Sequence, residues 1–283
     1  MGTRFIPATK SIPKEILTLV DRPLIQYAID EARDAGIEDF IFVTARGKAS
    51  LEDYFDHAPE LEARLKAGNK IDLLQKLRAT DMLSGAISYV RQREALGLGH
   101  AVNCARRLIG NEPFAVILTD DIIQTEGRSV LRQMVEEYSQ LEKGHMVATM
   151  EVSDEEISSY GVINPADPET KSACVRAKGL VEKPALKDAP SNLAVIGRYI
   201  LDPEIFNYLN RGQVGAGGEI QLTDAIDYSA NHNGNVYGFN FEGQRYDCGN
   251  KLGYLKATIA FGLENIELSA GFREHILEIA KEL

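Results

Sequence analysis

Residues 114–121 read Phe-Ala-Val-Ile-Leu-Thr-Asp-Asp, an unbroken apolar run that ends in two carboxylates. Such a run is typical of a central parallel strand that is covered on both faces. A carboxylate directly after the strand lies at the sheet edge where open α/β sheets bind ligands. This stretch therefore predicts a buried central strand with Asp120 at its functional end.

The chain before this strand alternates between helical and strand patterns. Apolar residues recur at helical spacing over 24–32, and β-forming residues fill 40–44. Residues 48–78 and 98–109 are predicted to be helical, with a strand at 86–90 between them. This alternation favours an α/β fold with a mostly parallel, mixed central sheet that is flanked by helices.

The pattern changes after residue 145, where short strand-like runs dominate. We expect an α/β domain over 1–248, divided near residue 145, and a C-terminal helical extension over 249–283. Apolar stripes on the last two predicted helices indicate a homo-oligomer, a homodimer or a homotetramer. The remaining predicted segments are a helix at 127–141, strands at 145–152, 161–163, 173–181, 193–201 and 235–241, and helices at 203–210 and 219–230.

Composition excludes several classes of protein. The 283 residues carry 31 Lys and Arg against 42 Asp and Glu, a net charge of −11, and 44% are hydrophobic. These are globular proportions, and the acidic balance argues against binding to nucleic acid or to a membrane. The three widely spaced cysteines, Cys104, Cys174 and Cys248, predict neither a zinc site nor a disulfide framework, which favours the cytoplasm. No apolar stretch approaches the ~20 residues of a membrane helix.

The N-terminal loop has the residue types that a polyphosphate site needs. Residues 2–14 read Gly-Thr-Arg-Phe-Ile-Pro-Ala-Thr-Lys-Ser-Ile-Pro-Lys. Gly2 permits close backbone approach, and Arg4, Lys10 and Lys14 supply cations. The spacing matches neither the P-loop nor the dinucleotide fingerprint, and a solvated basic N-terminus is the alternative. A loop of this kind follows a strand, so we expect a first strand that is missing from the chain as given.

Several segments resemble one family. The loop over 2–15 is similar to the signature of sugar-nucleotide pyrophosphorylases, in the variant of the bacterial enzymes that use UTP, where an apolar strand precedes it. The segments at 92–101, 191–199, 218–226 and 246–254 match the family in the same order. The resemblance implies a Rossmann-like nucleotidyltransferase fold, with a nucleotide half over 1–145 and a sugar half over 146–248.

The resemblance also implies a reaction: UTP and α-D-glucose 1-phosphate give UDP-glucose and pyrophosphate, with Mg²⁺ as the cofactor, in polysaccharide synthesis. A thymidylyltransferase or cytidylyltransferase on the same fold is one alternative. A non-catalytic subunit that binds sugar nucleotides is another.

The resemblance assigns a role to each candidate residue. Lys10 ranks below the other cations, and His100 is not expected to act as a base, because a phosphate monoester with a second pKa of ~6 is already largely ionised. The implied roles are Arg4 and Lys14 on the departing pyrophosphate, Gly2, Gln92, Gly97 and Asp120 on the nucleotide, Gly161, Glu182 and Lys183 on the sugar phosphate, and Asp120 and Asp247 on the metal ion.

Each assignment has a plainer alternative. Gln92 could be a polar strand end, and Glu182 with Lys183 could belong to an ordinary surface loop. Asp121, rather than Asp120, is the better candidate to cap the following turn. Asp247 could cap the helix predicted to begin near residue 250.

Overall fold

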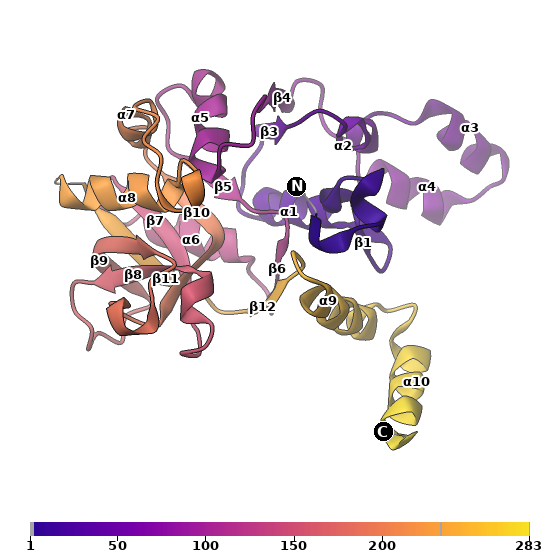
Figure 1. The fold of residues 1–283 in the computed structure, drawn as a ribbon. Coiled ribbons are helices and arrows are strands. Elements are labelled where there is room, and N and C mark those ends of the chain that lie inside the picture. Colours follow the sequence, from indigo (N-terminus) through magenta and orange to yellow (C-terminus); the bar gives the residue numbers. More distant parts are fainter. Residues whose placement is uncertain (1–2, 233, 283) are drawn as a thin grey trace.

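The computed structural model describes residues 3–232 and 234–282. Its centre is a six-stranded sheet with helices on both faces (Figure 1), as the alternation of helical and strand patterns predicted. In spatial order the strands are β5 (Phe114–Ile117), β10 (Leu193–Leu201), β7 (His145–Glu151), β11 (Val236–Asn240), β9 (Cys174–Glu182) and β8 (Gly161–Pro165).

Three two-stranded sheets accompany the large one. Four of their six strands were not predicted. Two of these have only two residues each, and the other two, β6 (Asp121–Gln124) and β12 (Gln244–Asp247), have four residues each and carry aspartate at one end, which strand propensity disfavours. The pairs are β3 (Phe40–Thr44) with β4 (Ile87–Arg91), β6 (Asp121–Gln124) with β12 (Gln244–Asp247), and β1 (Thr18–Leu19) with β2 (Arg22–Pro23).

The expectation of a mostly parallel sheet is wrong for the six-stranded sheet. Strand β5 pairs antiparallel with β10, and among the described strands of this sheet only β7 and β11 run parallel. Strands β3 and β4 are parallel, as expected. An apolar run reports that both faces of a strand are covered, and it carries no information about the direction of the neighbouring strand.

Two helical layers enclose the large sheet. On one face lie α1 (Leu24–Asp34) and α6 (Val130–Tyr138), and on the other lie α5 (Leu98–Ile109), α7 (Ile205–Leu209) and α8 (Leu222–Asn231). Strand β10 serves both layers, since Val195 and Leu201 belong to one buried cluster while Ile196 and Ile200 belong to the other. This double coverage explains the near-continuous apolar sequence of β10.

Two helical appendages extend from this body (Figure 1). The charged segment after β3 forms α2 (Ala49–Phe55), α3 (Pro59–Ala67) and α4 (Ile71–Arg78), and the chain ends in α9 (Lys251–Glu264) and α10 (Ser269–Glu282). The ring of Tyr254 packs edge-on against Phe5 at 5.5 Å, and that of Phe261 packs against Tyr27 at 5.0 Å. Aromatic contacts therefore anchor α9 to the N-terminal part of the chain.

None of the helices in the described residues is both long enough and apolar enough to cross a lipid bilayer.

Candidate active site

Asp120 lies in the turn between β5 and β6, just after the apolar run 114–118. Its carboxylate accepts a hydrogen bond of 2.5 Å from Lys14 Nζ. Lys14 begins the last of three short 3₁₀ turns that form the N-terminal loop. Burial opposes ionisation of Asp120, but the charge and hydrogen bond of Lys14 outweigh it and hold the pKa of this carboxyl below its usual value. The loop and the strand end therefore form one charged site.

Asp247 joins this site from the end of β12. A Cβ atom placed on Gly249 would lie 2.8 Å from Asp247 Oδ1 and 2.9 Å from Asp120 Oδ2. The two carboxylates therefore converge over a residue that has no side chain. The backbone N–H of Cys248 donates to the carbonyl of Asp120 at 2.7 Å, which fixes the two segments together. Asn250, and not Asp247, is the N-cap of α9, but the carboxylate of Asp247 accepts hydrogen bonds from Gly249 N at 2.8 Å and from the side chain of Asn250 at 2.9 Å.

Asp121 is not a turn cap, and that expectation is wrong. It begins β6, is buried, and its carboxylate accepts hydrogen bonds from Gly197 N at 2.9 Å and Arg245 Nε at 2.7 Å. Burial raises the pKa of Asp121, although the charge of Arg245 opposes the shift. Arg245 Nη1 donates in turn to the hydroxyl of Tyr160 at 2.8 Å. A buried polar chain thus connects the turn that carries Asp120 with the segment that precedes Gly161.

Arg198 stabilises the same turn through hydrogen bonds to its backbone, and it was not among the residues predicted from the sequence. Its side chain is 1% exposed and binds both carboxylate oxygens of Glu31 at 2.8 Å. It also donates to the carbonyls of Leu118 at 3.1 Å and Asp121 at 2.8 Å, one on each side of Asp120. An arginine inside the otherwise apolar run 193–201 is the signal that could have revealed it, because a buried guanidinium needs a partner.

Gln92 and Gly97 lie in the loop between β4 and α5. Gln92 Nε2 lies 3.2 Å from the carbonyl of Gly97 and 3.0 Å from His100 Nδ1. Gly97 has a φ of +99°, and a Cβ there would lie 2.8 Å from the carbonyl oxygen of Ile220. Glycine is therefore required at this position by the close passage of the segment before α8, which fixes the shape of the loop.

The three residues expected on the sugar phosphate lie together on the other half. Gly161 is opposite Glu182 in the β8–β9 pairing, and a Cβ on Gly161 would lie 3.0 Å from Glu182 Oε2. Lys183 follows with a φ of +47°, held by a hydrogen bond of 3.0 Å from its N–H to the carbonyl of Tyr160. A non-glycine residue in the left-handed region is uncommon and is enriched at ligand sites. Lys183 Nζ lies 3.8 Å from Glu182 Oε1.

The remaining candidate cations lie on the N-terminal loop. Arg4 and Lys10 lie on exposed 3₁₀ turns, on the same loop as Lys14. Gly2 lies outside the described residues. The structure therefore brings together Lys14, Asp120 and Asp247, and separately Gly161, Glu182 and Lys183, while Arg4 reaches neither group through a hydrogen bond or ion pair within the described residues.

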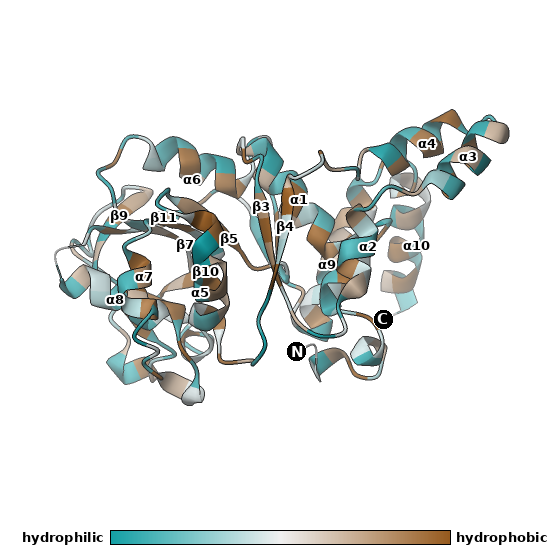
Figure 2. Ribbon diagram, turned by 90° about the horizontal axis from the view of Figure 1, so that it is seen from above, coloured by the Kyte–Doolittle hydropathy of each residue, from teal (hydrophilic) through white to brown (hydrophobic). Residues whose placement is uncertain are grey.

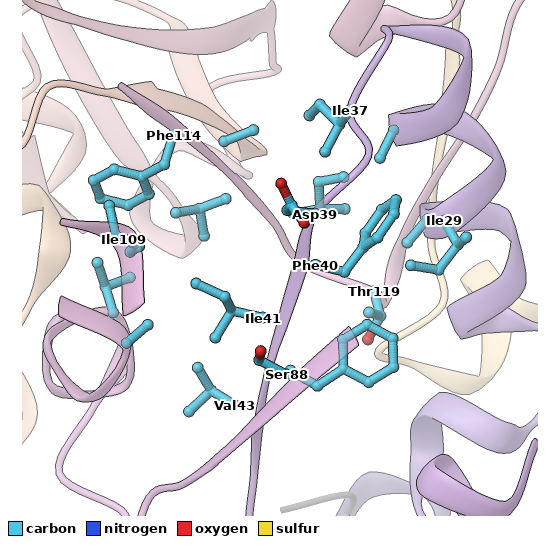
Figure 3. A pocket seen from close by; sticks show the side chains of 18 of the residues that line it. Ile29, Ile37, Asp39, Phe40, Ile41, Val43, Ser88, Ile109, Phe114 and Thr119 are labelled. Atoms are coloured by element: carbon cyan, nitrogen blue, oxygen red, sulfur yellow. The ribbon is translucent and has the colours of Figure 1, made fainter. Parts of the chain in front are cut away.

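A large apolar cavity lies beside the charged site. It measures about 870 Å³ and runs between β3 and β5, with Lys14, Thr119 and Asp120 at one end. Figure 3 shows the side chains of Ile41 and Phe114, from the two strands, among those that line it. An apolar lining does not suit the charged phosphates of a nucleoside triphosphate, because buried charges need partners. Only the charged end of the cavity therefore belongs to the candidate active site.

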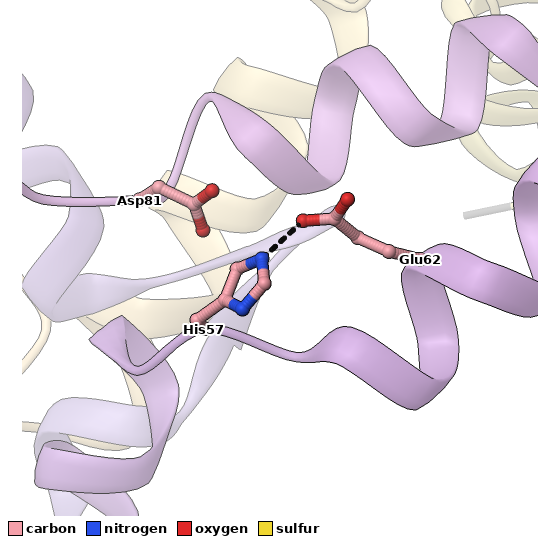
Figure 4. Close-up of side chains that lie close together, drawn as sticks. All are labelled: His57, Glu62 and Asp81. Atoms are coloured by element: carbon pink, nitrogen blue, oxygen red, sulfur yellow. Dashed lines mark hydrogen bonds and ion pairs between the residues drawn. The ribbon is translucent and has the colours of Figure 1, made fainter.

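A second polar cluster lies on the appendage of α2–α4. Figure 4 shows His57, Glu62 and Asp81. A ring nitrogen of the histidine and one carboxylate oxygen from each acidic residue, the atoms that could bind a metal ion, lie within 4.8 Å of one another. Glu62 already accepts hydrogen bonds of 2.8 Å from both Lys66 and Arg78, and these lower the pKa of its carboxyl to about 2. The charge of this carboxylate is therefore compensated, and the cluster is an ion-pair network between α3 and α4.

Comparison with known proteins gives a consistent result. The family model described as nucleotidyl transferase matches residues 1–261. A UTP–glucose-1-phosphate uridylyltransferase of Bacillus subtilis is 50% identical over 268 residues, which cover 95% of this chain and 90% of the relative.

Two solved structures are similar over nearly the whole chain. One is a UTP-bound enzyme from Acinetobacter baumannii, with a TM-score of 0.88, 41% identity, and coverage of 98% of this chain and 95% of that one. The other is a UDP-glucose pyrophosphorylase complexed with UDP-glucose, with a TM-score of 0.80, 47% identity, and coverage of 92% and 94%.

Proposed function

The chain belongs to the nucleotidyl transferase family, and from this premise we propose that it transfers the uridylyl group of UTP to α-D-glucose 1-phosphate, which yields UDP-glucose and pyrophosphate. The convergence of Lys14, Asp120 and Asp247 at the end of β5 is the observation that carries the proposal. A cation and two carboxylates at a strand end form the kind of site that positions phosphates and a metal ion.

The reaction requires alignment and charge neutralisation. An oxygen of the sugar phosphate attacks the α-phosphorus in line, and the bond to pyrophosphate breaks as the new P–O bond forms. This oxygen needs no base, since a phosphate monoester has a second pKa of ~6. Two anionic reactants must approach each other, so cations on both sides lower the barrier.

The chain's cations divide between the two reactants. Lys14 spends one of its three N–H donors on Asp120 and has the others for the phosphates of UTP, with Arg4 on the same loop. Lys183 holds the phosphate of the sugar, and Glu182 accepts from its hydroxyls. The Tyr160–Arg245–Asp121 chain of hydrogen bonds keeps the two groups in a fixed relation.

The carboxylates of Asp120 and Asp247 fit Mg²⁺. Both are oxygen donors, and they converge on one space, while Mg²⁺ uses one or two protein carboxylates and fills its other positions with phosphates and water. When bound there, the ion neutralises charge on the phosphates. Asp120 is kept ionised by Lys14, which preserves its capacity as a ligand.

A pyrophosphate-release assay tests the proposal. UTP, dTTP and CTP are each offered with glucose 1-phosphate and Mg²⁺, and release is expected to be fastest with UTP. Faster release with dTTP or CTP would assign the alternative nucleotidyltransferases, and binding of UDP-glucose without release would assign a non-catalytic subunit. Asp120→Asn should abolish most of the release, while Asp188→Asn, on an exposed turn, serves as the matched control.

We also propose that the protein works in the cytoplasm as a homodimer or homotetramer. Leu252, Leu255 and Ile259 on α9 and Leu277 on α10 have exposed fractions between 45% and 63%. Apolar side chains exposed together on helices often mark an interface between subunits. Analytical ultracentrifugation of the wild type and of Leu255→Asp measures the expected loss of assembly.

A further inference from the structure

Gln92 lies at the carboxyl end of β4, the kind of position at which α/β sheets bind ligands. Strands β3 and β4 lie side by side in Figure 2 and pair in parallel. The N–H of Gln92 continues this pairing with a hydrogen bond of 2.8 Å to the carbonyl of Thr44, so the sheet fixes the backbone of Gln92. Its side-chain amide has an acceptor, Oε1, on one side and a donor group, Nε2, on the other. The orientation of this amide therefore decides which partner it can bind.

The carbonyl of Gly97 determines which way the amide is turned. Gly97 is the N-cap residue of α5, and its carbonyl oxygen lies 3.2 Å from Gln92 Nε2. A carbonyl oxygen only accepts hydrogen bonds, so the amide group that faces it must be the NH₂ group and not the oxygen. The N–H of Ala101 donates to the same carbonyl at 3.1 Å, which holds it in the first turn of the helix.

His100 supplies a second contact to the same NH₂ group. Its Nδ1 lies 3.0 Å from Gln92 Nε2. A hydrogen bond forms here only when Nδ1 carries no proton, because a protonated Nδ1 would place two donors against each other, and the neutral ring therefore has its proton on Nε2. Both hydrogens of the Gln92 amide are then used, while within the described residues no group donates to its Oε1. The oxygen of this half-buried residue is the group left for a ligand.

We propose that His100 is a positioning residue that selects the base of the nucleotide through Gln92. By accepting from Gln92 Nε2, His100 keeps Oε1 turned toward the base. Oε1 accepts a hydrogen bond from N3–H of uracil, whereas N3 of cytosine is itself an acceptor and is repelled. Without His100 Nδ1 the amide turns more easily, and Nε2 then donates to cytosine. This role rests on the proposed use of UTP and explains how the site separates two nucleotides that share the same ribose and phosphates.

Binding titrations test the role of His100 without requiring turnover. Titration calorimetry with Mg²⁺ and without glucose 1-phosphate gives the Kd of UTP, CTP and dTTP for the wild type, His100→Leu and His100→Asn. Leucine has no acceptor, whereas Oδ1 of asparagine takes the place of Nδ1. The preference for UTP over CTP should fall roughly fivefold in His100→Leu, because one hydrogen bond to the amide is lost, and stay within about twofold of the wild type in His100→Asn.

The nucleotide dTTP is the internal control. Thymine presents the same N3–H between two carbonyls as uracil does, so the preference for UTP over dTTP should be equal in all three proteins. An unchanged preference over CTP in His100→Leu, an equal fall in both variants, or an equal fall against dTTP would overturn the role of His100, even if the wild type releases pyrophosphate from UTP. The expected binding ratios in a wild type that releases no pyrophosphate would instead refute the proposed reaction alone.

Nitrogen NMR of isotope-labelled histidine tests the ring itself. The spectrum of the free protein is recorded at a pH where the His100 ring is neutral, and its signals are assigned by their loss in His100→Asn. We expect the proton of His100 on Nε2, because Nδ1 accepts from Gln92. A proton on Nδ1 would overturn the proposal independently of any nucleotide.

Discussion

Arg198→Met is the substitution that most directly tests the structural support of Asp120. Methionine keeps much of the volume of the side chain and removes the guanidinium. The change leaves the Glu31 carboxylate without its cation and frees the carbonyls of Leu118 and Asp121, which lie on either side of Asp120. We expect both stability and activity to fall.

The expected size of the stability loss follows from burial. The side chain of Arg198 is 1% exposed and that of Glu31 is 10% exposed, so solvent compensates little of the lost interaction. Removing one partner of a buried ion pair costs about 3–5 kcal/mol. At roughly 2–4 °C per kcal/mol for a chain of this size, the Tm should fall by about 10 °C. Loss of the hydrogen bonds to the turn should also lower kcat, since misplacement by about 1 Å can cost 10²-fold.

The coupling free energy between Arg198 and Glu31 is measured by urea unfolding of four proteins: the wild type, Arg198→Met, Glu31→Gln and the double variant. The double variant should recover much of the loss, because it leaves no unpaired charge in the interior. Arg132→Met is the control, since its ion pair with Glu136 is exposed and its loss should lie within the error of measurement. The reasoning fails if Arg198→Met costs no more than Arg132→Met, or if the two single losses simply add in the double variant.

Three further predictions concern single residues. Lys183→Ala should raise the KM for glucose 1-phosphate far more than that for UTP in steady-state assays, and equal effects on both would refute its assignment. Gly97→Ala should cost about 1–3 kcal/mol in urea unfolding, because its φ is positive and a Cβ would meet backbone at 2.8 Å, while Gly110→Ala, which also has a positive φ but has open space around its Cβ, should cost less. Burial lowers the pKa of His145 to about 4, so the unfolded state takes up the proton first. The contribution of neutral, buried His145 to the unfolding free energy should therefore be complete above pH 6.5 and decrease progressively toward pH 4. His145→Gln should flatten this pH dependence, and a variant with the pH profile of the wild type would contradict the prediction.

Much of the fold could be predicted from local patterns. The run 193–201 became a strand with the same bounds, and 98–109 became a helix with the same bounds, because burial on both faces or on one helical face leaves a periodic mark in the sequence. Among the charged groups at the candidate site that the structure describes, Asp121 was named beforehand only as a turn cap, and Glu31, Arg198 and Arg245 were not named. These four residues support the site without being expected to touch a reactant, and their partners lie far away in the chain.

Local patterns in the amino-acid sequence are enough to assign the α/β class, the strand end that carries Asp120 and the family resemblance of the loop that carries Lys14, because strand propensity, apolar periodicity and short motifs are properties of neighbouring residues. The antiparallel pairing of β5 with β10, the approach of Asp247 to Asp120 over Gly249, and the hydrogen bonds of Arg198 to the turn that carries Asp120 emerge only in the folded chain. Pairing direction and buried ion pairs depend on segments that lie between 77 and 167 positions apart in the chain, and packing energy, rather than local propensity, selects their contacts.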